Sequence, residues 1–371
     1  MTTTVELHRV RMPEHAGRRL TEVLRSGYIA DGSLVRDFEN RLRDFVGNPH
    51  VETAGEYSGA LTLALFQAGV RPGDEVLTCP EACLGTNMPI LSLFAKPVWC
   101  DVDPQTGIID PLDVAARVTE RTRALLFFHW GGDVAPIDEL LAVAREHGIA
   151  AIEDASEAFG AEYRGRKVGN TGCDYTVWSF GPVRHMTTGE GAAITFANGE
   201  EAERFRCLKR YGIHQPTFRD EFGEIDPSSD IPEPGLNSYM NNIAAAIGLE
   251  QIADIEPAIE RHRQNGAFYE SKLATVGGID LIQRLPDAVS GYWVYTLLAE
   301  RRDDLQRALA DAGIRSSKLH LRNDTYSAFG TGLADLPGCA AFSARRLCIP
   351  CGWWVTDEDR LRVVERVYAG W

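Results

Sequence analysis

Four ionisable side chains in two short segments of the chain could carry acid/base chemistry. Arg184 and His185 lie in WSFGPVRHMTTGEG, and Asp154 and Glu157 lie in IEDASEAFG. The imidazole of His185 can act as a general base near neutral pH. A guanidinium stays protonated, so Arg184 can bind an anionic substrate or pair with a carboxylate but cannot remove a proton. These residues predict either an acid/base group beside a fixed positive charge or a buried structural ion pair.

Apolar stretches that alternate with helical patterns predict the elements that position these residues. Buried parallel strands are expected at 75–79, 97–101, 124–129 and 149–154, and two further strands at 174–180 and 192–197. Helices are expected between them at 58–68, 86–94 and 136–147. This alternation is typical of an α/β domain with a mainly parallel central sheet and helices on both faces. Such sheets bind ligands at the carboxyl ends of their strands, where Asp154 stands.

The second half of the chain changes character. Residues 212–237 are rich in Pro, Asp, Glu and Gly, and we expect a long functional or interfacial loop there. The later elements are expected at 239–251, 255–276, 302–312 and 356–368 for helices and at 292–299 for a strand. We therefore predict a large α/β domain with an N-terminal arm over residues 1–255 and a small α+β domain over residues 256–371.

The composition limits the classes of function. The 371 residues are 44% hydrophobic and 25% charged, as in an ordinary globular protein, and their formal net charge is −15. This charge argues against nucleic acid or an anionic membrane as partner, because both are recognised by clusters of Lys and Arg. The N-terminus lacks the apolar core of a signal peptide, and no apolar run reaches about 18 residues. We therefore expect a cytoplasmic protein without a membrane span.

The cysteines predict packing rather than metal or redox chemistry. Eight cysteines are scattered along the chain, mostly in apolar or strand-like stretches, which suits reduced and buried thiols. Cys348 and Cys351 form a C-x-x-C pair, but no second pair or histidine follows at the spacing of a zinc site. We expect no metal site.

The segment around Arg184 resembles the cofactor-anchoring segment of the DegT/DnrJ/StrS sugar aminotransferases, a family of fold type I pyridoxal-phosphate (PLP) enzymes. The family reads S-F-x-x-x-K-x-x-T-T-G-E/D-G, and this chain reads SFGPVRHMTTGEG. The resemblance extends from about residue 15 to the C-terminus and implies the fold type I aminotransferase fold. It also implies that Arg184 replaces the lysine that forms the Schiff base with PLP, a bond that arginine cannot form. Only five lysines remain as substitutes, at positions 96, 167, 209, 272 and 318.

The resemblance gives the two carboxylates cofactor roles. Asp154 matches the aspartate that pairs with the pyridine nitrogen of PLP, although a carboxylate at a strand end can also be a helix N-cap. Glu157 stands where the family has Gln or His beside the phenolic oxygen of the cofactor. A carboxylate there would repel a phenolate unless it were protonated, and it could instead be a new acid or base.

Compared with the family, this chain also differs in the segment that binds the phosphate of PLP, the phosphate cup. The segment HVETAGEYSGALTLAL matches the cup without gaps, and Glu56, Tyr57 and Ser58 replace the family's Ser-Gly-Thr. Glu56 would put a negative charge beside the phosphate, although it could instead complement the dipole of the following helix. Tyr57 is bulky where the backbone normally comes close to the ligand. Both residues are therefore candidates for new chemistry in a changed site.

Other residues keep roles that the resemblance implies. Ser179 matches a phosphate-binding serine, Asn237 matches an asparagine that reaches the phosphate of the neighbouring subunit, and Cys83 lies against the cofactor face in relatives. Glu190 is expected to orient loop amides. His185 keeps a structural alternative, since the family often has His or Asn there.

The family pattern also implies how substrate and subunits meet. His320 and Arg322 could face the ligand from the small domain. Family precedent implies a homodimer with shared active sites, in which the N-terminal arm and the loop at 212–237 reach the partner's pocket.

Three functions remain open. We favour an enzyme of natural-product or sugar/cyclitol biosynthesis that uses PLP-independent acid/base chemistry in the vacated pocket, because the cup and the lysine position both differ. Its acid/base candidates are Glu157, His185, Glu56 and Tyr57, with Arg184 holding an anion. The second function is a sugar dehydratase or aminotransferase that binds pyridoxamine phosphate (PMP) or PLP without a covalent anchor. The third is a non-catalytic partner of an active aminotransferase. The substrate would be a small molecule, such as a sugar or nucleotide sugar, and conventional transamination is not expected.

Overall fold

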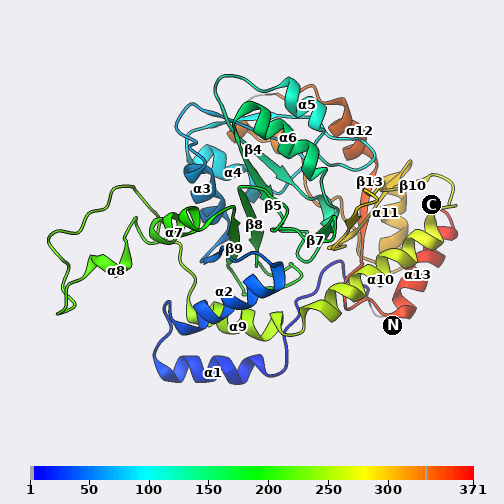
Figure 1. Cartoon of the computed structure of the whole chain (residues 1–371). Helices are drawn as coiled ribbons and strands as arrows, with labels where there is room; N and C mark the ends of the chain where they lie inside the picture. The colour runs from blue at the N-terminus through cyan, green and yellow to red at the C-terminus, as the bar shows by residue number, and fades with distance from the viewer. Residues whose placement is uncertain (1–3, 331) are drawn as a thin grey trace.

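The computed structural model describes residues 4–330 and 332–371 and has a seven-stranded sheet at its centre (Figure 1). The strand order is β1-β9-β8-β5-β4-β2-β3. The five strands from β8 to β3 are parallel, and β9 runs antiparallel to both of its neighbours. The strands are β1 Val51–Ala54, β2 Glu75–Thr78, β3 Lys96–Trp99, β4 Thr122–Phe128, β5 Ala150–Asp154, β8 Tyr175–Ser179 and β9 Ala192–Phe196.

Helices cover both faces of this sheet because its strands are apolar on both sides. Leu126 and Ile152 pack into the core that includes α3 and α7, whereas Leu125 and Phe127 pack into the core that includes α2 and α6. Alternate residues of a strand point to opposite faces, so each strand contributes to two cores. The helices are α1 Ala16–Ser26, α2 Ser33–Val46, α3 Tyr57–Gln67, α4 Leu84–Ser92, α5 Pro111–Ala116, α6 Ile137–His147 and α7 Gly199–Leu208.

A second, antiparallel sheet of three strands lies in the C-terminal part of the chain. It contains β10 Ile279–Leu281, β12 Tyr295–Ala299 and β13 Arg346–Ile349. Its core includes side chains of α10 Ile255–Leu273, α11 Arg302–Asp311 and α13 Asp357–Tyr368. The remaining strands, β6 Glu162–Tyr163, β7 Arg166–Lys167 and β11 Ala288–Val289, form a small third sheet. The remaining helices are α8 Gln215–Phe218, α9 Asn242–Ile252, α12 Pro337–Arg345 and the 3-10 turns η1 Trp130–Gly132, η2 Asn323–Thr325 and η3 Ser327–Phe329.

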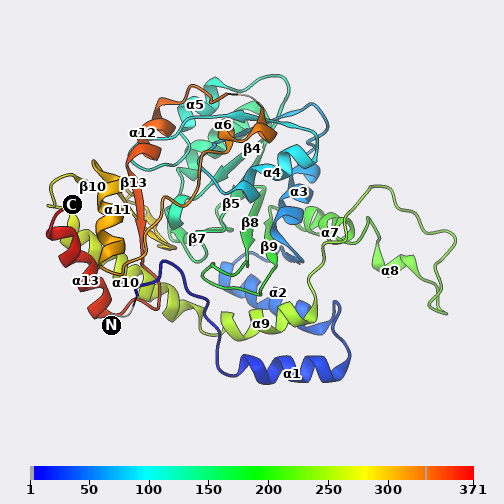
Figure 2. The same ribbon diagram turned by 180° about the vertical axis from the view of Figure 1, so that it is seen from behind.

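The segment at 212–237 projects away from the rest of the molecule and carries α8 (Figures 1 and 2). It exposes large apolar side chains, among them Phe222 and Ile225. In the N-terminal segment, Val5 pairs with Ile314, so this segment lies against the C-terminal part of the chain. The predicted division near residue 255 stays a prediction.

The predicted α/β class with a mainly parallel central sheet is confirmed, but several boundaries differ. The strand expected at 292–299 begins only at Tyr295, because Tyr292 has φ 45°, which interrupts an extended chain. The helix expected at 239–251 begins at Asn242, because the side chain of Asn241 caps it by accepting from the backbone N of Ala244. Helices α1 and α2 were not predicted.

None of the described helices combines the length and the apolar composition that crossing a bilayer requires.

Candidate active site

The predicted acidic residues meet at the carboxyl edge of the central sheet. Asp154 is the last residue of β5, and Glu157 follows it in the turn after the strand. Both side chains are completely buried. Buried carboxylates must be hydrogen-bonded or paired, so their partners define what this edge of the sheet can do.

Asp154 is held by neutral donors. The Tyr57 hydroxyl lies 2.5 Å and the Thr86 hydroxyl 2.7 Å from its Oδ2, and the backbone N of Ser156 donates to Oδ1 at 3.1 Å. Burial, together with the neighbouring Asp154 carboxylate, raises the pKa of Tyr57 well above its usual value. The phenol therefore keeps its proton and donates a hydrogen bond to the carboxylate.

The ring of Tyr57 fills the space between the starts of α3 and α4. Tyr57 is the first residue of α3 and is 9% exposed. A Cβ atom placed on Gly85, in the first turn of α4, would lie 3.0 Å from this ring. The ring and the glycine are thus in close contact, and the hydroxyl reaches Asp154 at the end of β5.

Glu157 is held by a guanidinium, an imidazole and a backbone amide. Its Oε1 lies 3.2 Å from Nη1 of Arg184 and 3.1 Å from Nε2 of His320, and its Oε2 accepts from the backbone N of Gly131 at 2.9 Å. An ionised carboxylate only accepts, so Nε2 of His320 carries the proton of this hydrogen bond. The Nδ1 atom of His320 is then left as the proton acceptor of the ring.

Two aromatic side chains, those of Trp293 and His8, lie beside Arg184. No sequence pattern singled out either residue. The guanidinium of Arg184 lies 4.8 Å from the ring centre of Trp293, and His8 stacks on Trp293 with ring centres 4.6 Å apart. Burial lowers the pKa of His8 to about 4, although Glu157 opposes this shift. His8 comes from the N-terminal segment, where no periodic pattern or motif marks it.

The side chain of His185 contacts a backbone carbonyl and the ring of a second histidine. It is 3% exposed, and its Nε2 lies 2.8 Å from the carbonyl oxygen of Gly291, to which it donates. Its ring lies 4.8 Å from that of His262. Burial is the main cause that lowers the pKa of His185 well below its usual value. A neutral imidazole bound to a carbonyl fits the structural role, and its role as base stays a prediction.

The start of α3 brings together the residues of the predicted phosphate cup. Glu56 precedes the helix without capping it, and its carboxylate lies against Gly59, where a Cβ atom would come within 2.0 Å of Oε1. The Ser238 hydroxyl lies beside the same glycine and is buried without a hydrogen-bond partner among the described residues. Ser58 and Asn237 are exposed. Ser179 is the last residue of β8, and its hydroxyl accepts from the backbone N of Gly181 at 3.2 Å.

The other predicted residues have structural partners or face solvent. Arg322 is buried and paired with Asp324, with Nη2 2.6 Å from Oδ2, and it also donates to the carbonyl of Ala334. Cys83 precedes α4, and burial raises the pKa of its thiol. Glu190 is exposed, and its carbonyl accepts from the Thr188 hydroxyl.

No lysine contacts either carboxylate in the described part of the chain. Lys209 is buried between Glu39 and Glu52, Lys167 pairs with Glu256 and Lys318 with Asp303, and Lys96 and Lys272 are exposed. Over residues 4–330 and 332–371, no group of three or more His, Cys, Asp or Glu side chains could hold a metal ion. All eight cysteines are free thiols, and most are buried.

Comparison with known proteins relates the whole chain to one family. The model of the DegT/DnrJ/EryC1/StrS aminotransferase family matches residues 11–368. GDP-perosamine synthase of Caulobacter vibrioides is 34% identical over 345 residues, which cover 90% of this chain and 89% of that protein. The spore coat polysaccharide biosynthesis protein SpsC of Bacillus subtilis is 30% identical over 94% of this chain and 92% of its own length. The crystal structure of the sugar aminotransferase CalS13 from Micromonospora echinospora superimposes with a TM-score of 0.94 at 34% identity, covering 99% of this chain and 100% of that one.

Proposed function

This chain belongs to the DegT/DnrJ/EryC1/StrS aminotransferase family, and we propose that it is an enzyme of sugar or cyclitol modification that works by acid/base chemistry without PLP. The contact between Tyr57 and Asp154 carries this proposal. By the family resemblance, Asp154 is the carboxylate that would pair with the pyridine nitrogen of PLP. In this chain a phenol donates to that carboxylate, which supports the proposal that the ring of Tyr57 takes the place of the cofactor ring.

The surrounding residues fit PLP poorly in two further respects. The carboxylate of Glu56 lies at the start of α3, where a bound phosphate would meet a like charge. By the family resemblance the covalent anchor would be at position 184, and arginine cannot provide it. None of the five lysines contacts Asp154 or Glu157 among the described residues. We therefore derive no chemical step through PLP.

The proposed base is Nδ1 of His320. Because Nε2 donates to Glu157, a proton taken from a substrate hydroxyl or activated C–H group would go to Nδ1. The resulting imidazolium would be stabilised by the Glu157 carboxylate at 3.1 Å, as in other histidine–carboxylate pairs. Glu157 is thus a positioning residue rather than the base itself. Return of the proton from Nδ1 to a different substrate carbon would complete an isomerisation, and its delivery to a substrate hydroxyl that leaves as water would complete a dehydration.

Arg184 supplies the fixed positive charge of the proposed site. Its side chain is only about 10% exposed and shares Oε1 of Glu157 with His320. It balances the carboxylate and can also face negative charge that develops on a substrate oxygen when His320 takes a proton. The rings of Trp293 and His8 reduce access of water to the guanidinium.

The proposed substrate is a sugar or nucleotide sugar. GDP-perosamine synthase and the sugar aminotransferase CalS13 are named for sugar chemistry, and both are related to this chain over nearly its whole length. We further propose a homodimer with shared active sites. The projecting segment at 212–237, with exposed Phe222 and Ile225, supports a partner contact, because exposed apolar side chains on a long projecting loop favour burial against another chain.

A second candidate is an enzyme that binds PMP or PLP without a covalent bond. The unpartnered, buried hydroxyl of Ser238 at the start of α3 favours it, because such a hydroxyl could bind phosphate. Asp154, Ser58, Ser179, Asn237 and Cys83 would then hold the cofactor, and the ring of Tyr57 would have to move out of its contact with Asp154.

Titration of the purified protein with PLP and PMP separates the two candidates. A ligand that binds only the folded chain must raise the thermal midpoint, and bound PLP or PMP also shifts its absorbance band. We expect neither change with the unaltered chain at millimolar ligand. We expect the double variant Tyr57→Gly, Arg184→Lys to gain saturable PLP binding, because it opens the ring site and supplies an amine. Arg184→Lys alone is the control. It should show no saturable PLP binding, because Tyr57 still fills the site. Saturable PMP binding by the unaltered chain would overturn the cofactor-free proposal.

A further inference from the structure

The backbone beside His320 adopts an unfavourable conformation. Residues 318–322, which the structure describes, lie in neither a helix nor a strand. Within them, Leu319 has φ 58°, a left-handed conformation that is uncommon for a residue with a side chain of this size. Such a conformation costs free energy and persists only where the surrounding contacts hold it. The contacts around Leu319 therefore decide where the ring of His320 lies.

The side chain of Arg346 holds the backbone on both sides of Leu319. Its Nε donates to the carbonyl oxygen of Lys318 at 2.9 Å, and its Nη2 donates to the carbonyl oxygen of His320. The donors of a guanidinium lie in one rigid plane, so these two hydrogen bonds fix the two carbonyl groups relative to each other. A flexible single donor could not hold both.

Arg346 is buried, and its charge is balanced by a carboxylate. Arg346 is 2% exposed and Glu81, in the loop after β2, is completely buried. Nη1 of Arg346 lies 2.9 Å from Oε2 of Glu81 and donates to the Ser343 hydroxyl at 2.6 Å. That hydroxyl in turn donates to Glu81. The guanidinium can therefore remain charged inside the protein while it binds the two carbonyl groups.

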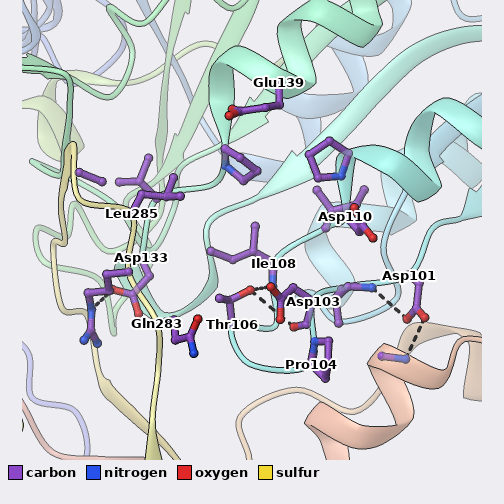
Figure 3. A pocket seen from close by; sticks show the side chains of 18 of the residues that line it. Asp101, Asp103, Pro104, Thr106, Ile108, Asp110, Asp133, Glu139, Gln283 and Leu285 are labelled. Carbon is purple, nitrogen blue, oxygen red and sulfur yellow. Dashed lines mark hydrogen bonds and ion pairs between the residues drawn. The ribbon is translucent and has the colours of Figure 1, made fainter.

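The helix before Arg346 fixes the position from which this side chain acts. Helix α12 ends at the preceding residue, and at its start the Asp101 carboxylate accepts from the backbone N of Gly338 at 2.8 Å and of Cys339 at 2.7 Å. Asp101 and Gly338 lie at the wall of a cavity of about 780 Å³ (Figure 3). A Cβ atom on Gly338 would lie 2.0 Å from the carbonyl oxygen of Val102, so only glycine permits this approach. Helix α12 is thus attached closely to the loop after β3.

Two aromatic side chains contact the ring of His320. Trp130 meets it edge to face, with ring centres 5.7 Å apart and planes at 87°, and the ring centre of Phe128 lies 6.1 Å away. The guanidinium of Arg346 lies 5.1 Å from the ring centre of Trp130. Arg346 therefore holds the backbone of His320 and also contacts an aromatic side chain that packs on its ring.

We propose that Arg346, with its charge balanced by Glu81, is a positioning residue for His320. By fixing the backbone on both sides of Leu319, it keeps Nε2 of His320 on the carboxylate of Glu157 and so keeps the proton off Nδ1. The inference rests on the proposed function, in which Nδ1 is the base. Without the two hydrogen bonds from Arg346, Leu319 is free to leave its left-handed conformation, the ring moves off Glu157, and the proton distributes over both ring nitrogens.

The tautomer of His320 is the direct readout, and it requires no substrate. ¹⁵N NMR of the full chain with ¹⁵N-labelled histidine, at about pH 9, shows which ring nitrogen carries the proton. The signals that disappear in His320→Gln are those of His320. We expect Nε2 to be preferred over Nδ1 by about tenfold or more, because its hydrogen bond has a charged acceptor. An unaltered chain without this preference would overturn both the positioning role and the proposed base.

A double variant tests the positioning role by itself. Glu81→Gln, Arg346→Met removes both charges, so that no buried charge is left without a partner. We expect the preference for Nε2 to fall below about threefold, because the ring is no longer held on Glu157. Arg302→Met is the matched control, since Arg302 donates to the carbonyl of Ser343 at 2.6 Å but, among the described residues, forms no hydrogen bond with residues 318–320. It should keep the preference of the unaltered chain. If the double variant keeps it as well, Arg346 does not position His320, whereas the proposed base stands.

Arg346→Lys separates the geometry of the guanidinium from its charge. An ammonium group keeps a positive charge opposite Glu81 but lacks the planar set of donors that reaches both carbonyl groups. We expect the tautomer preference to fall as it does in the double variant, while near-UV circular dichroism still reports a folded chain. A full preference for Nε2 in Arg346→Lys would show that charge alone is sufficient, and it would overturn the role of the two backbone hydrogen bonds.

Discussion

Asp154 and Glu157 lie three positions apart, are both completely buried, and are nevertheless held by different kinds of group. Asp154 accepts from two hydroxyls and a backbone amide, whereas Glu157 accepts from a guanidinium, an imidazole and a backbone amide. In the first arrangement, the ring of Tyr57 covers the carboxylate of Asp154. The second pairs a carboxylate with a guanidinium and, among the described residues, leaves Nδ1 of His320 without a hydrogen-bond partner. The difference teaches that burial alone does not identify the reactive carboxylate, because the type of donor decides which protons can move.

The largest expected difference concerns the charge of the two carboxylates. Glu157→Gln leaves the guanidinium of Arg184 buried without a counter-charge, and we expect it to lower the free energy of unfolding by about 3 kcal/mol. Asp154→Asn retains an acceptor for the Tyr57 and Thr86 hydroxyls, and we expect a loss of about 1 kcal/mol. Urea denaturation of both variants measures the two losses. Equal losses would contradict the contrast between a charge-balanced and a hydroxyl-held carboxylate.

A smaller loss of stability is expected when the Tyr57 hydroxyl, which donates to Asp154, is removed. Tyr57→Phe keeps the ring and removes the hydroxyl, so that Asp154 loses its closest donor. We expect the free energy of unfolding to fall by about 2 kcal/mol, because a buried carboxylate is left less satisfied. The exposed Tyr28 provides the control, since Tyr28→Phe should change stability by less than about 0.5 kcal/mol. If both variants unfold at the same urea concentration, the contact between Tyr57 and Asp154 contributes nothing to stability.

The smallest expected effect concerns His262, which packs against the ring of His185, in contrast to His320, which pairs with Glu157. Burial lowers the pKa of His262 to about 4, below the 6.5 of an unfolded chain. The folded chain then binds fewer protons than the unfolded chain between these values, so stability falls as pH falls through this range. From pH 7 to pH 5.5, His262 should account for about 1 kcal/mol of this loss.

The variant His262→Gln tests this contribution. Thermal midpoints measured between pH 7 and pH 5.5 should fall less steeply for His262→Gln than for the unaltered chain. His147→Gln is the control, because His147 is exposed and should not change the slope. An unchanged slope in His262→Gln would show that His262 is not held neutral in the fold.

Much of the architecture could be predicted because its signals are local. The strand that ends at Asp154 and the helix that ends at Gly148 were both recognised from runs of five to twelve residues, and the structure has them as β5 and α6. Gly148 adopts φ 63°, a left-handed conformation that glycine permits at a helix end. The boundaries that were missed depend on the φ angle of Tyr292 and on the side-chain cap made by Asn241, which no run of apolar residues specifies.

The partners in the site could not be predicted in the same way. Tyr57 was recognised as too bulky for a phosphate cup, but its hydrogen bond to Asp154 joins residues 97 positions apart. His320 was placed on the ligand side only by family resemblance, and it meets Glu157 across 163 positions. Thr86 lay at the start of an expected helix, but the helical pattern did not show which side chain faces Asp154. His8 had no motif at all.

The sequence by itself determined the fold class, the acidic edge of the sheet and the identity of the residue at position 184, because periodicity and residue type are properties of short segments. The tertiary structure alone decided that Tyr57 donates to Asp154 and that Glu157 pairs with Arg184 and His320. The physical reason is that hydrogen bonds and ion pairs act over about 3 Å in space, whereas their partners are brought together only by the packing of the whole chain.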